Sequence, residues 1–269
     1  MNFHVVTGLP RSGSTLLCNV LNQNPDFFAS STSPMCAVVS SMQSAFTASA
    51  EAKSEFIARR QTTADAIVGA MRCALGGWYE GFTDAKHVFD KGRGWATQVR
   101  LFEILSPTGK MVVCVRDLRD VLASVERQHA KTAFVDDAER PHGRSLFERA
   151  SAMFAPDGII GACVTAVDDL LRRKPECVHV VRYEDFVRRP KTTLSALHEE
   201  LGLDPFDYDF DLVVNVSTDV DGLYWGKFPH DGSGAVRPDE SRWSDWVSED
   251  VAKEIMRRFP GYNSAFGYS

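Results

Sequence analysis

The 269-residue sequence lacks three features, and each absence excludes a class of protein. No apolar run is long enough to cross a bilayer, which takes about 20 residues, so we expect no membrane-spanning helix. Basic residues are not in excess. The 30 Lys and Arg residues stand against 36 Asp and Glu, whereas a general nucleic-acid binder is usually basic. The net charge of −6 also disfavours a polyanionic glycan substrate, unless a local basic cleft overrides it.

Closely spaced cysteine pairs are the third missing feature. None of the six cysteines stands in a C-x-x-C spacing, which argues against a zinc knuckle or a redox dithiol. Cys18 and Cys114 fall inside apolar runs and are typical of small core residues. The chain opens directly into an apparent strand, so we expect no signal peptide and a reducing, cytoplasmic location.

What the sequence does contain is an alternation of strand and helix patterns. Strands are expected at residues 3–7, 86–90, 110–115 and 178–182. Helical spacing follows from about residue 14, over 35–76, 95–102, 118–125, 146–173 with a break at 156–158, 190–201 and 249–259. Residues 128–146 and 203–245 are expected to be loop or irregular. This order predicts an α/β fold with a parallel β-sheet flanked by helices, in one domain over residues 1–269.

The first strand meets the first helix through the loop Gly8-Leu9-Pro10-Arg11-Ser12-Gly13-Ser14-Thr15. Free N–H groups and the helix dipole favour an anion at such a helix start, and glycine permits close backbone approach. The spacing is that of the phosphate loop G-x-x-x-x-G-K-[ST], but Ser14 stands where the lysine belongs. Because that lysine serves the β- and γ-phosphates of a nucleoside triphosphate, its loss argues against ATP or GTP hydrolysis. An ordinary glycine-rich turn remains the alternative for this loop alone.

A second motif, Val113-Cys114-Val115-Arg116-Asp117-Leu118-Arg119-Asp120-Val121-Leu122-Ala123-Ser124, is a buried strand followed by a helix. Arg116 is expected at the carboxyl end of its strand, where ligands bind in open α/β sheets. Its planar guanidinium suits a phosphate, and Ser124 lies two helical turns further on. The alternative, a plain helix start capped by Asp117, does not explain Arg116. We assign Asp120 and Arg127 to the solvated face of this helix.

The residues 8–17, GLPRSGSTLL, resemble the 5′-phosphosulfate loop of sulfotransferases that use 3′-phosphoadenosine-5′-phosphosulfate (PAPS), nearest to the tyrosylprotein and bacterial branches. The resemblance covers residues 1–130 well and 175–260 loosely. It implies a P-loop-kinase-like sheet and a product, PAP, whose 3′-phosphate is bound by Arg116 and Ser124. The loop residues expected to bind the donor are Pro10, Arg11, Ser12, Gly13, Ser14 and Thr15.

Further positions fit the same family. Lys91 ends the second strand, where relatives carry a lysine near the sulfuryl group, although it fits a surface turn as well. Tyr183, in a strand-end segment that resembles the family's, is either a nucleotide contact or a half-buried core tyrosine. The late loop 232–237 resembles the segment that closes over the donor, and it adds Gly234 and Arg237 as ligands, with Lys227 before it. Trp243 and Trp246 are more typical of core anchors.

One departure from the family concerns the catalytic base. Relatives with this loop often have a glutamate shortly after the first helix, but residues 29–34 here contain no carboxylate. Other relatives have a histidine where this chain has Arg93. Asp90, His129 and His142 are candidates by their chemistry alone.

These observations predict in-line transfer of a sulfuryl group from PAPS to a hydroxyl or amine of a small molecule, glycan or peptide. Arg11 and Lys91 are the expected catalytic residues, since cations stabilise the charge that develops as the S–O bond breaks. The motifs contain no cluster of carboxylates that could bind Mg²⁺, so we expect no metal ion. Two alternatives stay open: a P-loop nucleotide kinase or NTPase, and a non-catalytic protein that binds PAP or PAPS.

Overall fold

Alternate residues of the central strands face two separate apolar cores. The computed structural model describes residues 1–132, 145–173, 175–216, 232–239 and 241–268. Within strand β1 (Asn2–Gly8), Val5 belongs to one core and Val6 to the other. Strand β4 (Met111–Val115) alternates in the same way, with Val113 facing the first core and Val112 the second. Because side chains alternate along a strand, this pattern buries both faces of the sheet.

The sheet has five strands in the order β2-β3-β1-β4-β5, and every neighbouring pair is parallel. The other three strands are β2 (Phe27–Ala29), β3 (His87–Lys91) and β5 (Val178–Arg182). The predicted parallel α/β fold is therefore confirmed. Strand β2 was not expected, and its three residues are too few to show a period in the sequence.

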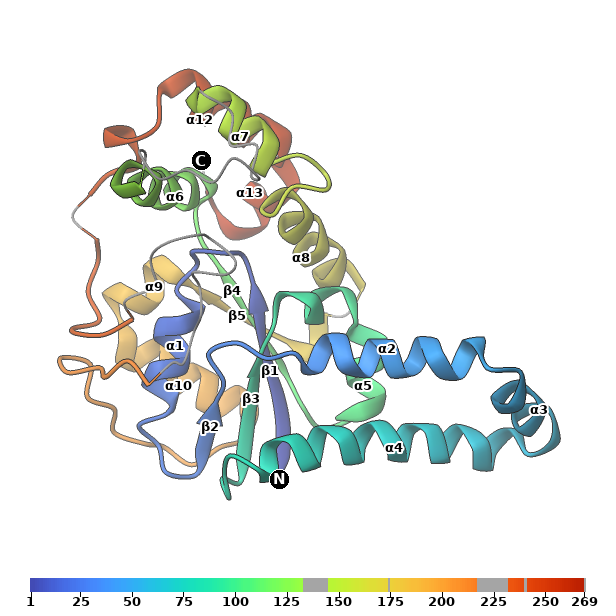
Figure 1. Cartoon of the computed structure of the whole chain (residues 1–269). Coiled ribbons are helices and arrows are strands. Elements are labelled where there is room, and N and C mark those ends of the chain that lie inside the picture. Colours follow the sequence, from blue (N-terminus) through green and yellow to red (C-terminus); the bar gives the residue numbers. More distant parts are fainter. Residues whose placement is uncertain (133–144, 174, 217–231, 240, 269) are drawn as a thin grey trace.

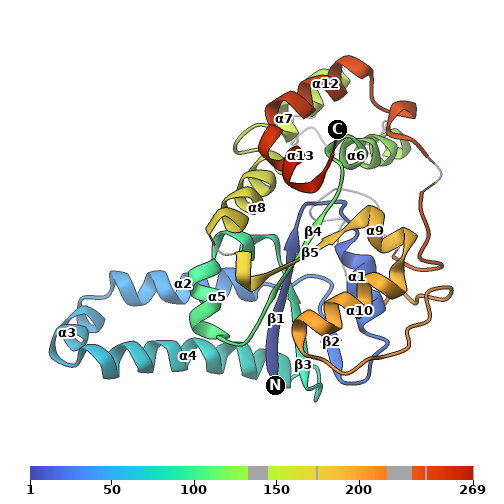
Figure 2. The ribbon, with the colours of Figure 1, turned by 180° about the vertical axis from the view of Figure 1, so that it is seen from behind.

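Helices cover both faces of this sheet (Figures 1 and 2). The second core is closed by α1 (Ser14–Leu21), α9 (Tyr183–Arg188) and α10 (Pro190–Leu201). The first core is closed by α2 (Met35–Ala48), α4 (Arg60–Glu80), α5 (Val99–Leu105) and α8 (Gly161–Arg173). Helices α6 (Leu118–Thr132), α7 (Leu146–Met153), α12 (Glu249–Arg258) and α13 (Pro260–Phe266) extend that core beyond the carboxyl ends of the strands.

Short elements complete the order: α3 (Ala50–Ala58) and the 3-10 turns η1 (Arg93–Thr97), η2 (Pro175–Cys177) and η3 (Trp243–Asp245). Some of these differ from expectation. The helix expected over 95–102 is divided at Gln98 into η1 and α5, and α6 continues to Thr132 where a loop was expected from residue 128. The short helices α9 and α13 were not predicted, because six or seven residues hold too little of a helical period.

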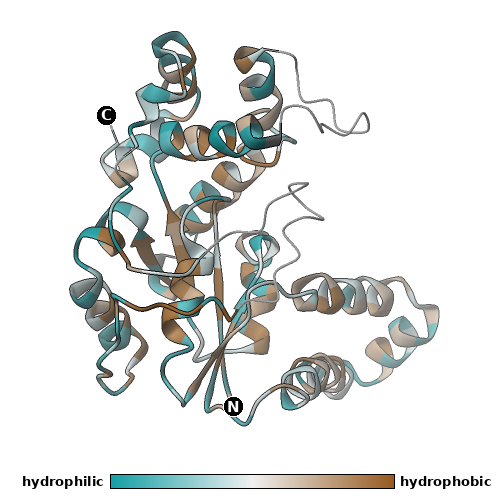
Figure 3. Cartoon of the chain, turned by 60° about the vertical axis from the view of Figure 1, so that its left-hand side comes forward, coloured by the Kyte–Doolittle hydropathy of each residue, from teal (hydrophilic) through white to brown (hydrophobic). Residues whose placement is uncertain are grey.

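The region 35–80 projects from the sheet as an arm of three helices, α2, α3 and α4 (Figures 1 and 2). The helical prediction for 35–76 is confirmed, with a break where the Ser49 hydroxyl accepts the N–H of Ala52 and begins α3. Hydrophobic residues gather on the strands at the centre of the molecule (Figure 3). None of the described helices combines the length and the apolar character that a membrane span requires.

Candidate functional site

The loop between β1 and α1 turns sharply against the neighbouring strand. Gly8 has a φ of 127°, and a Cβ there would lie 2.1 Å from the carbonyl oxygen of Cys114 on β4. The Ser12 hydroxyl donates a 2.6 Å hydrogen bond to the carbonyl oxygen of Leu9, which closes the loop. Gly13 then adopts a φ of 80° directly before α1, and only a glycine fits there because a Cβ would meet the Tyr183 ring at 2.6 Å. The start of α1 is thereby exposed to the space above the sheet.

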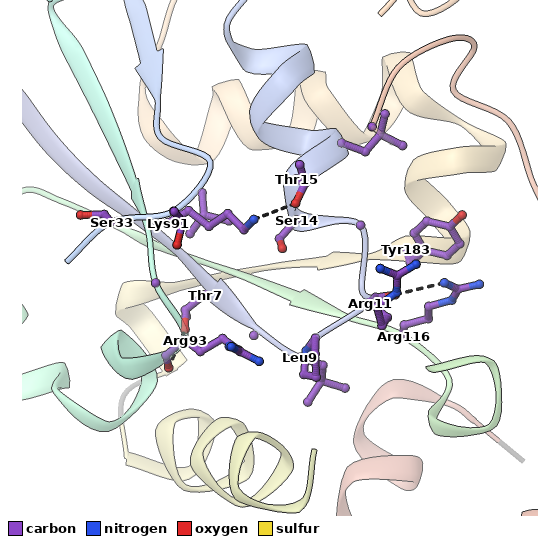
Figure 4. A pocket seen from close by; sticks show the side chains of 18 of the residues that line it. Thr7, Leu9, Arg11, Ser14, Thr15, Ser33, Lys91, Arg93, Arg116 and Tyr183 are labelled. Carbon is purple, nitrogen blue, oxygen red and sulfur yellow. Dashed lines mark hydrogen bonds between the residues drawn. The ribbon is translucent and has the colours of Figure 1, made fainter. Parts of the chain in front are cut away.

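That space is a cavity of about 670 Å³ at the carboxyl ends of the strands, which is the size of a small-molecule site (Figure 4). Ten of the residues predicted for the site line it: Pro10, Arg11, Gly13, Ser14, Thr15, Lys91, Arg116, Ser124, Tyr183 and Arg237. Two predicted ligands do not line it. The Ser12 hydroxyl is used inside the loop, and Gly234, with a φ of 87°, shapes the late loop by pairing with Val213. Lys227 lies outside the described residues.

Arg116 follows β4 directly, as the sequence predicted, and it is held from three sides. Its guanidinium lies 4.0 Å from the centre of the Tyr183 ring and donates a 3.0 Å bond to the carbonyl oxygen of Arg11. Its backbone is fixed by the Tyr262 hydroxyl, which accepts the Arg116 N–H at 3.2 Å and donates to the Arg116 carbonyl at 2.9 Å. Tyr262 belongs to α13, so the last helix of the chain positions this arginine. Tyr262 was not predicted, because it is far from both motifs in the sequence.

Arg11 is the one residue other than glycine with a positive φ among the described residues, at 61°. Its Nε donates to the Ser124 hydroxyl at 3.0 Å, so the two predicted motifs meet at this bond. Burial, followed by the nearby charges of Arg116 and Arg127, lowers the pKa of Arg11 from its ordinary range to about 10. The guanidinium therefore remains cationic at neutral pH, at an energetic cost that a bound anion would offset.

Lys91 lies across the cavity from Arg116, on the other side of the loop (Figure 4). Its Nζ donates a 2.7 Å hydrogen bond to the Thr15 hydroxyl at the start of α1, and its backbone N–H bonds to the Ser30 hydroxyl at 2.8 Å. These contacts place the amine beside the N-terminus of α1 in the cavity wall. Lys91 is therefore part of the site and not a surface turn residue.

The structure corrects the placement of Arg127, which was assigned to the solvated face of its helix. Arg127 lines the cavity and pairs with Asp239, with 2.7 Å between its Nη2 and the carboxylate. Since Arg127 stands three residues after Ser124 on α6, it faces the same direction as that predicted ligand. The i, i+3 spacing was the signal that could have identified it.

Asn19 was also missed, and it joins the late loop to α1. This side chain is buried, and its Nδ2 lies 3.1 Å from the carbonyl oxygen of Gly232 and 3.1 Å from Oδ1 of Asn215. Gly232 and Ser233 line the cavity next to the loop. An asparagine inside the apolar run of α1 was the available sign, because a buried polar side chain needs hydrogen-bond partners.

Two of the three candidate bases, Asp90 and His129, are described by the structure, and neither of these two lines the described cavity wall. Asp90 is fully buried, and burial raises its pKa. Its Oδ1 accepts the Trp95 Nε1–H at 2.6 Å, while its Oδ2 accepts the hydroxyls of Ser33 and Tyr79. His129 is in the last turn of α6, and His142 lies outside the described residues.

Comparison with known proteins gives one family. Residues 5–208 match the family model described as the sulfotransferase family. No curated protein matches the sequence. Similar solved structures include a sulfotransferase domain from the curacin biosynthetic pathway, with 19% identity, coverage of 96% of this chain and 97% of that one, and a TM-score of 0.52. A mouse sulfotransferase in complex with PAP is 12% identical, and the match covers 100% of this chain and 89% of the mouse chain with a TM-score of 0.55. A sulfotransferase from Mycobacterium avium is 13% identical, and the match covers 99% of this chain and 77% of that chain with a TM-score of 0.52.

At these identities the solved structures establish the shared fold alone. The family match reaches further, because it spans most of the chain and includes both motifs, at 8–17 and 113–124. It favours sulfuryl transfer over the kinase and NTPase alternatives, in agreement with the serine at position 14. The protein belongs to the sulfotransferase family.

Proposed function

We propose that this enzyme transfers a sulfuryl group from PAPS to a hydroxyl or amine of an acceptor, and that the described cavity holds the donor. One observation carries the proposal. Nη1 of Arg11 and Nε of Arg116 are buried in the cavity wall and have no hydrogen-bond partner among the described residues. Buried donors on charged groups are costly unless an anion satisfies them. These two arginines are linked, since Nη1 of Arg116 donates a 3.0 Å hydrogen bond to the backbone carbonyl oxygen of Arg11, and together they fit a ligand with more than one phosphate group.

The two motifs divide the donor between them in this proposal. The loop 8–15 and the start of α1 would hold the 5′-phosphosulfate, because free N–H groups and the helix dipole favour an anion there. Arg116, Ser124 and Arg237 would hold the 3′-phosphate, with Tyr183 beside the nucleotide. The mouse relative was solved with PAP, which supports this ligand.

Bound PAPS would supply an activated sulfuryl group on a good leaving phosphate. Attack by the acceptor forms a new S–O or S–N bond, the S–O bond to the phosphate breaks, and the acceptor proton is released. Lys91 and Arg11 stabilise the negative charge that grows on the bridging and equatorial oxygens. Lys91 is suited to the bridging oxygen because its amine already lies 2.7 Å from Thr15 at the helix start.

A cytoplasmic location is part of the proposal. Cys18 and Cys114 are buried in the second core as small apolar residues, and burial raises the pKa of the Cys114 thiol. The chain also has no closely spaced C-x-x-C pair, and cysteines used in this way fit a reducing compartment.

The test is ligand preference in a thermal unfolding assay. PAP should raise the unfolding temperature far more than ADP at equal concentration, since ADP lacks the 3′-phosphate. At a hundredfold excess over its Kd, PAP should stabilise the protein by about 2.7 kcal/mol. Arg116→Ala should remove most of the preference for PAP, whereas Arg100→Ala, on an exposed position of α5, should leave it unchanged.

Equal shifts for PAP and ADP in the wild-type protein would contradict the donor assignment. PAP binding without transfer from PAPS to any acceptor, or to water, would instead favour the non-catalytic alternative. Release of PAP from PAPS, followed by chromatography, separates these outcomes.

A further inference from the structure

The cavity has a second wall that the donor motifs do not account for. It is built by the start of α2, with Ser33, Cys36 and Ser40, and by η1 and the residue after it, with Arg93, Thr97 and Gln98. Figure 4 shows Ser33, Lys91 and Arg93 on one side of the loop 8–15, and Arg11, Arg116 and Tyr183 on the other. If the nucleotide occupies the side of Arg116, the second wall faces the acceptor.

The second wall presents only a few kinds of chemical group to the cavity, among the residues that the structure describes. Among the described residues that line the cavity there, none is aromatic and none is acidic, and Arg93 is the charged residue that η1 contributes. Burial raises the pKa of Cys36 to about 11, so its thiol is neutral at physiological pH. A wall of small hydroxyls, an amide and a guanidinium suits a polar, oxygen-rich molecule. It gives a flat apolar acceptor no ring to stack on.

Arg93 is carried on a well-anchored turn. Its carbonyl oxygen accepts a 3.2 Å bond from the Thr7 hydroxyl on β1, and Gly92 donates to the carbonyl of Val6 at 2.9 Å. Two residues on, the fully buried Trp95 is bonded to Asp90. Figure 4 shows the Arg93 side chain running from η1 toward Leu9 in the donor loop. A guanidinium held on a fixed backbone loses less freedom when it binds an anion.

The whole cavity is strongly cationic. Its described lining contains six cations and one carboxylate, and that carboxylate is already paired. The cations are Arg11, Lys91, Arg93, Arg116, Arg127 and Arg237, and the carboxylate is Asp239. PAPS brings about four negative charges, mostly on the phosphates, and these fall on the side of Arg11 and Arg116. About one of the five net positive charges then remains, and Arg93 is the cation to which neither the donor assignment nor the pair with Asp239 gives a role, so this side of the cavity favours a second anion over a protonated amine.

We propose that the acceptor is an alcohol that carries an oxyanion, a carboxylate or a phosphate, close to its hydroxyl, and that Arg93 binds this oxyanion. The inference rests on the proposed function. Arginine binds carboxylates and phosphates through two parallel N–H bonds, so it fixes direction as well as charge. An acceptor held in this way would present its hydroxyl toward Lys91, on the same side of the loop. The overall acidity of the chain does not oppose an anionic substrate, because six basic residues and one carboxylate line the described cleft.

The experiment uses matched pairs of alcohols that differ in the oxyanion alone. Glycerol 3-phosphate is compared with glycerol, glucuronate with its methyl ester, and 3-hydroxybenzoate with its methyl ester, all with PAPS and the full-length protein. We expect kcat/KM for the anionic member to be higher by about tenfold or more, as charged hydrogen bonds usually allow. Arg93→Gln should abolish that preference while the Kd for PAP stays within about twofold, because Arg93 lies on the acceptor side.

Arg100→Gln is the control, since it removes the same charge from an exposed position just beyond this wall. Its acceptor preference should match the wild-type preference. Equal or better rates with the neutral members would overturn the inference, as would an Arg93→Gln variant that slows both members of each pair equally.

A second measurement needs no turnover. Calorimetry on the PAP-saturated protein should detect glucuronate and glycerol 3-phosphate, but not the ester or glycerol, and Arg93→Gln should lose this signal. Absence of any oxyanion binding in the PAP complex also overturns the inference. Failure of PAP itself to bind is a different result: it contradicts the donor assignment made above.

Discussion

Without a bound anion, the buried arginines of the cavity lower the free energy of unfolding, and substitution of Arg11 should reveal this energetic cost. Arg11 combines a left-handed φ of 61°, a buried Nη1 without a partner among the described residues, and two neighbouring cations. Each feature opposes folding of the unliganded protein and favours binding of an anion. We therefore predict that Arg11→Ala makes the empty protein more stable and the PAP-loaded protein less stable than the wild type.

The magnitude follows from the structure. The pKa of Arg11, lowered to about 10, means that charging this side chain costs on the order of 3 kcal/mol in the folded state, at about 1.4 kcal/mol per pKa unit. Loss of the 3.0 Å bond to Ser124 costs about 1 kcal/mol, and loss of the packed side-chain stem about 1 more. The net gain for Arg11→Ala is about 1 kcal/mol, or an unfolding temperature higher by about 2–4 °C.

Glycine at the same position gives a matched comparison. Arg11→Gly removes the charge and also the left-handed strain of about 1–2 kcal/mol, against an entropic cost of about 0.5–1 kcal/mol. It should therefore be at least as stable as Arg11→Ala when empty. The lowered pKa of Arg11 also determines how this stability penalty changes with pH. Because the pKa of Arg11 is lower in the folded state, the penalty on the wild type is complete at neutral pH and diminishes as the pH rises above about 10.

The assay is calorimetric unfolding in a chloride buffer without phosphate or sulfate, since both anions would occupy the cavity. Each variant is scanned empty and with saturating PAP, and Arg100→Ala serves as the control that should match the wild type in both states. If empty Arg11→Ala unfolds at a lower temperature than the empty wild type, the buried guanidinium is a net stabiliser. The reasoning that this cavity is held ready for an anion would then be refuted.

Two further predictions concern Lys91 and Tyr262. Lys91→Ala should lower kcat on the order of 10²–10³-fold with little change in PAP affinity, and Lys91→Arg should not restore full activity, because a planar guanidinium does not replace a compact ammonium. Turnover of PAPS, including its slow hydrolysis, measures this, and near wild-type rates in a folded variant would show that Lys91 takes no part in the transfer. Tyr262→Phe removes the hydroxyl that clamps the Arg116 backbone, so it should cost about 1–3 kcal/mol of stability and narrow the preference for PAP over ADP. Tyr208→Phe removes a hydroxyl bonded to His198 away from the donor cavity, so it should lower stability without changing that preference.

The donor side of the site was predictable because each part of it is a short, continuous motif at a strand end. In a parallel sheet the carboxyl ends of neighbouring strands meet at one edge, so the loop after β1, Lys91 at the end of β3 and Arg116 after β4 had to converge. The hydrogen bond from Arg11 to Ser124 joins the two motifs at that edge. The roles of these residues in binding and transfer stay predictions.

The other contributors could not be read from local sequence. Tyr262 acts on Arg116 from a helix near the end of the chain, and Asn19 reaches a loop more than 200 residues away. Such contacts depend on tertiary packing, which no period or motif records. The second wall was hidden for another reason: Ser33, Cys36 and Thr97 are residue types that occur on any surface, and they matter because two separate segments place them around one cavity.

Asp90 explains how those two segments are held together. This carboxylate was a candidate base, but both of its oxygens are engaged in the core, so it cannot contact an acceptor directly. Through Ser33 it fixes the residues just before α2, and through Trp95 it fixes η1, which carries Arg93. Its chain neighbour is Lys91, whose side chain lines the cavity. A buried carboxylate bound by three neutral donors is unfavourable for stability alone, as its raised pKa reflects. Its position is better explained by the site: the end of β3 joins the wall proposed for the acceptor to Lys91, the lysine proposed to be catalytic, just as the ends of β1 and β4 assemble the side proposed for the donor.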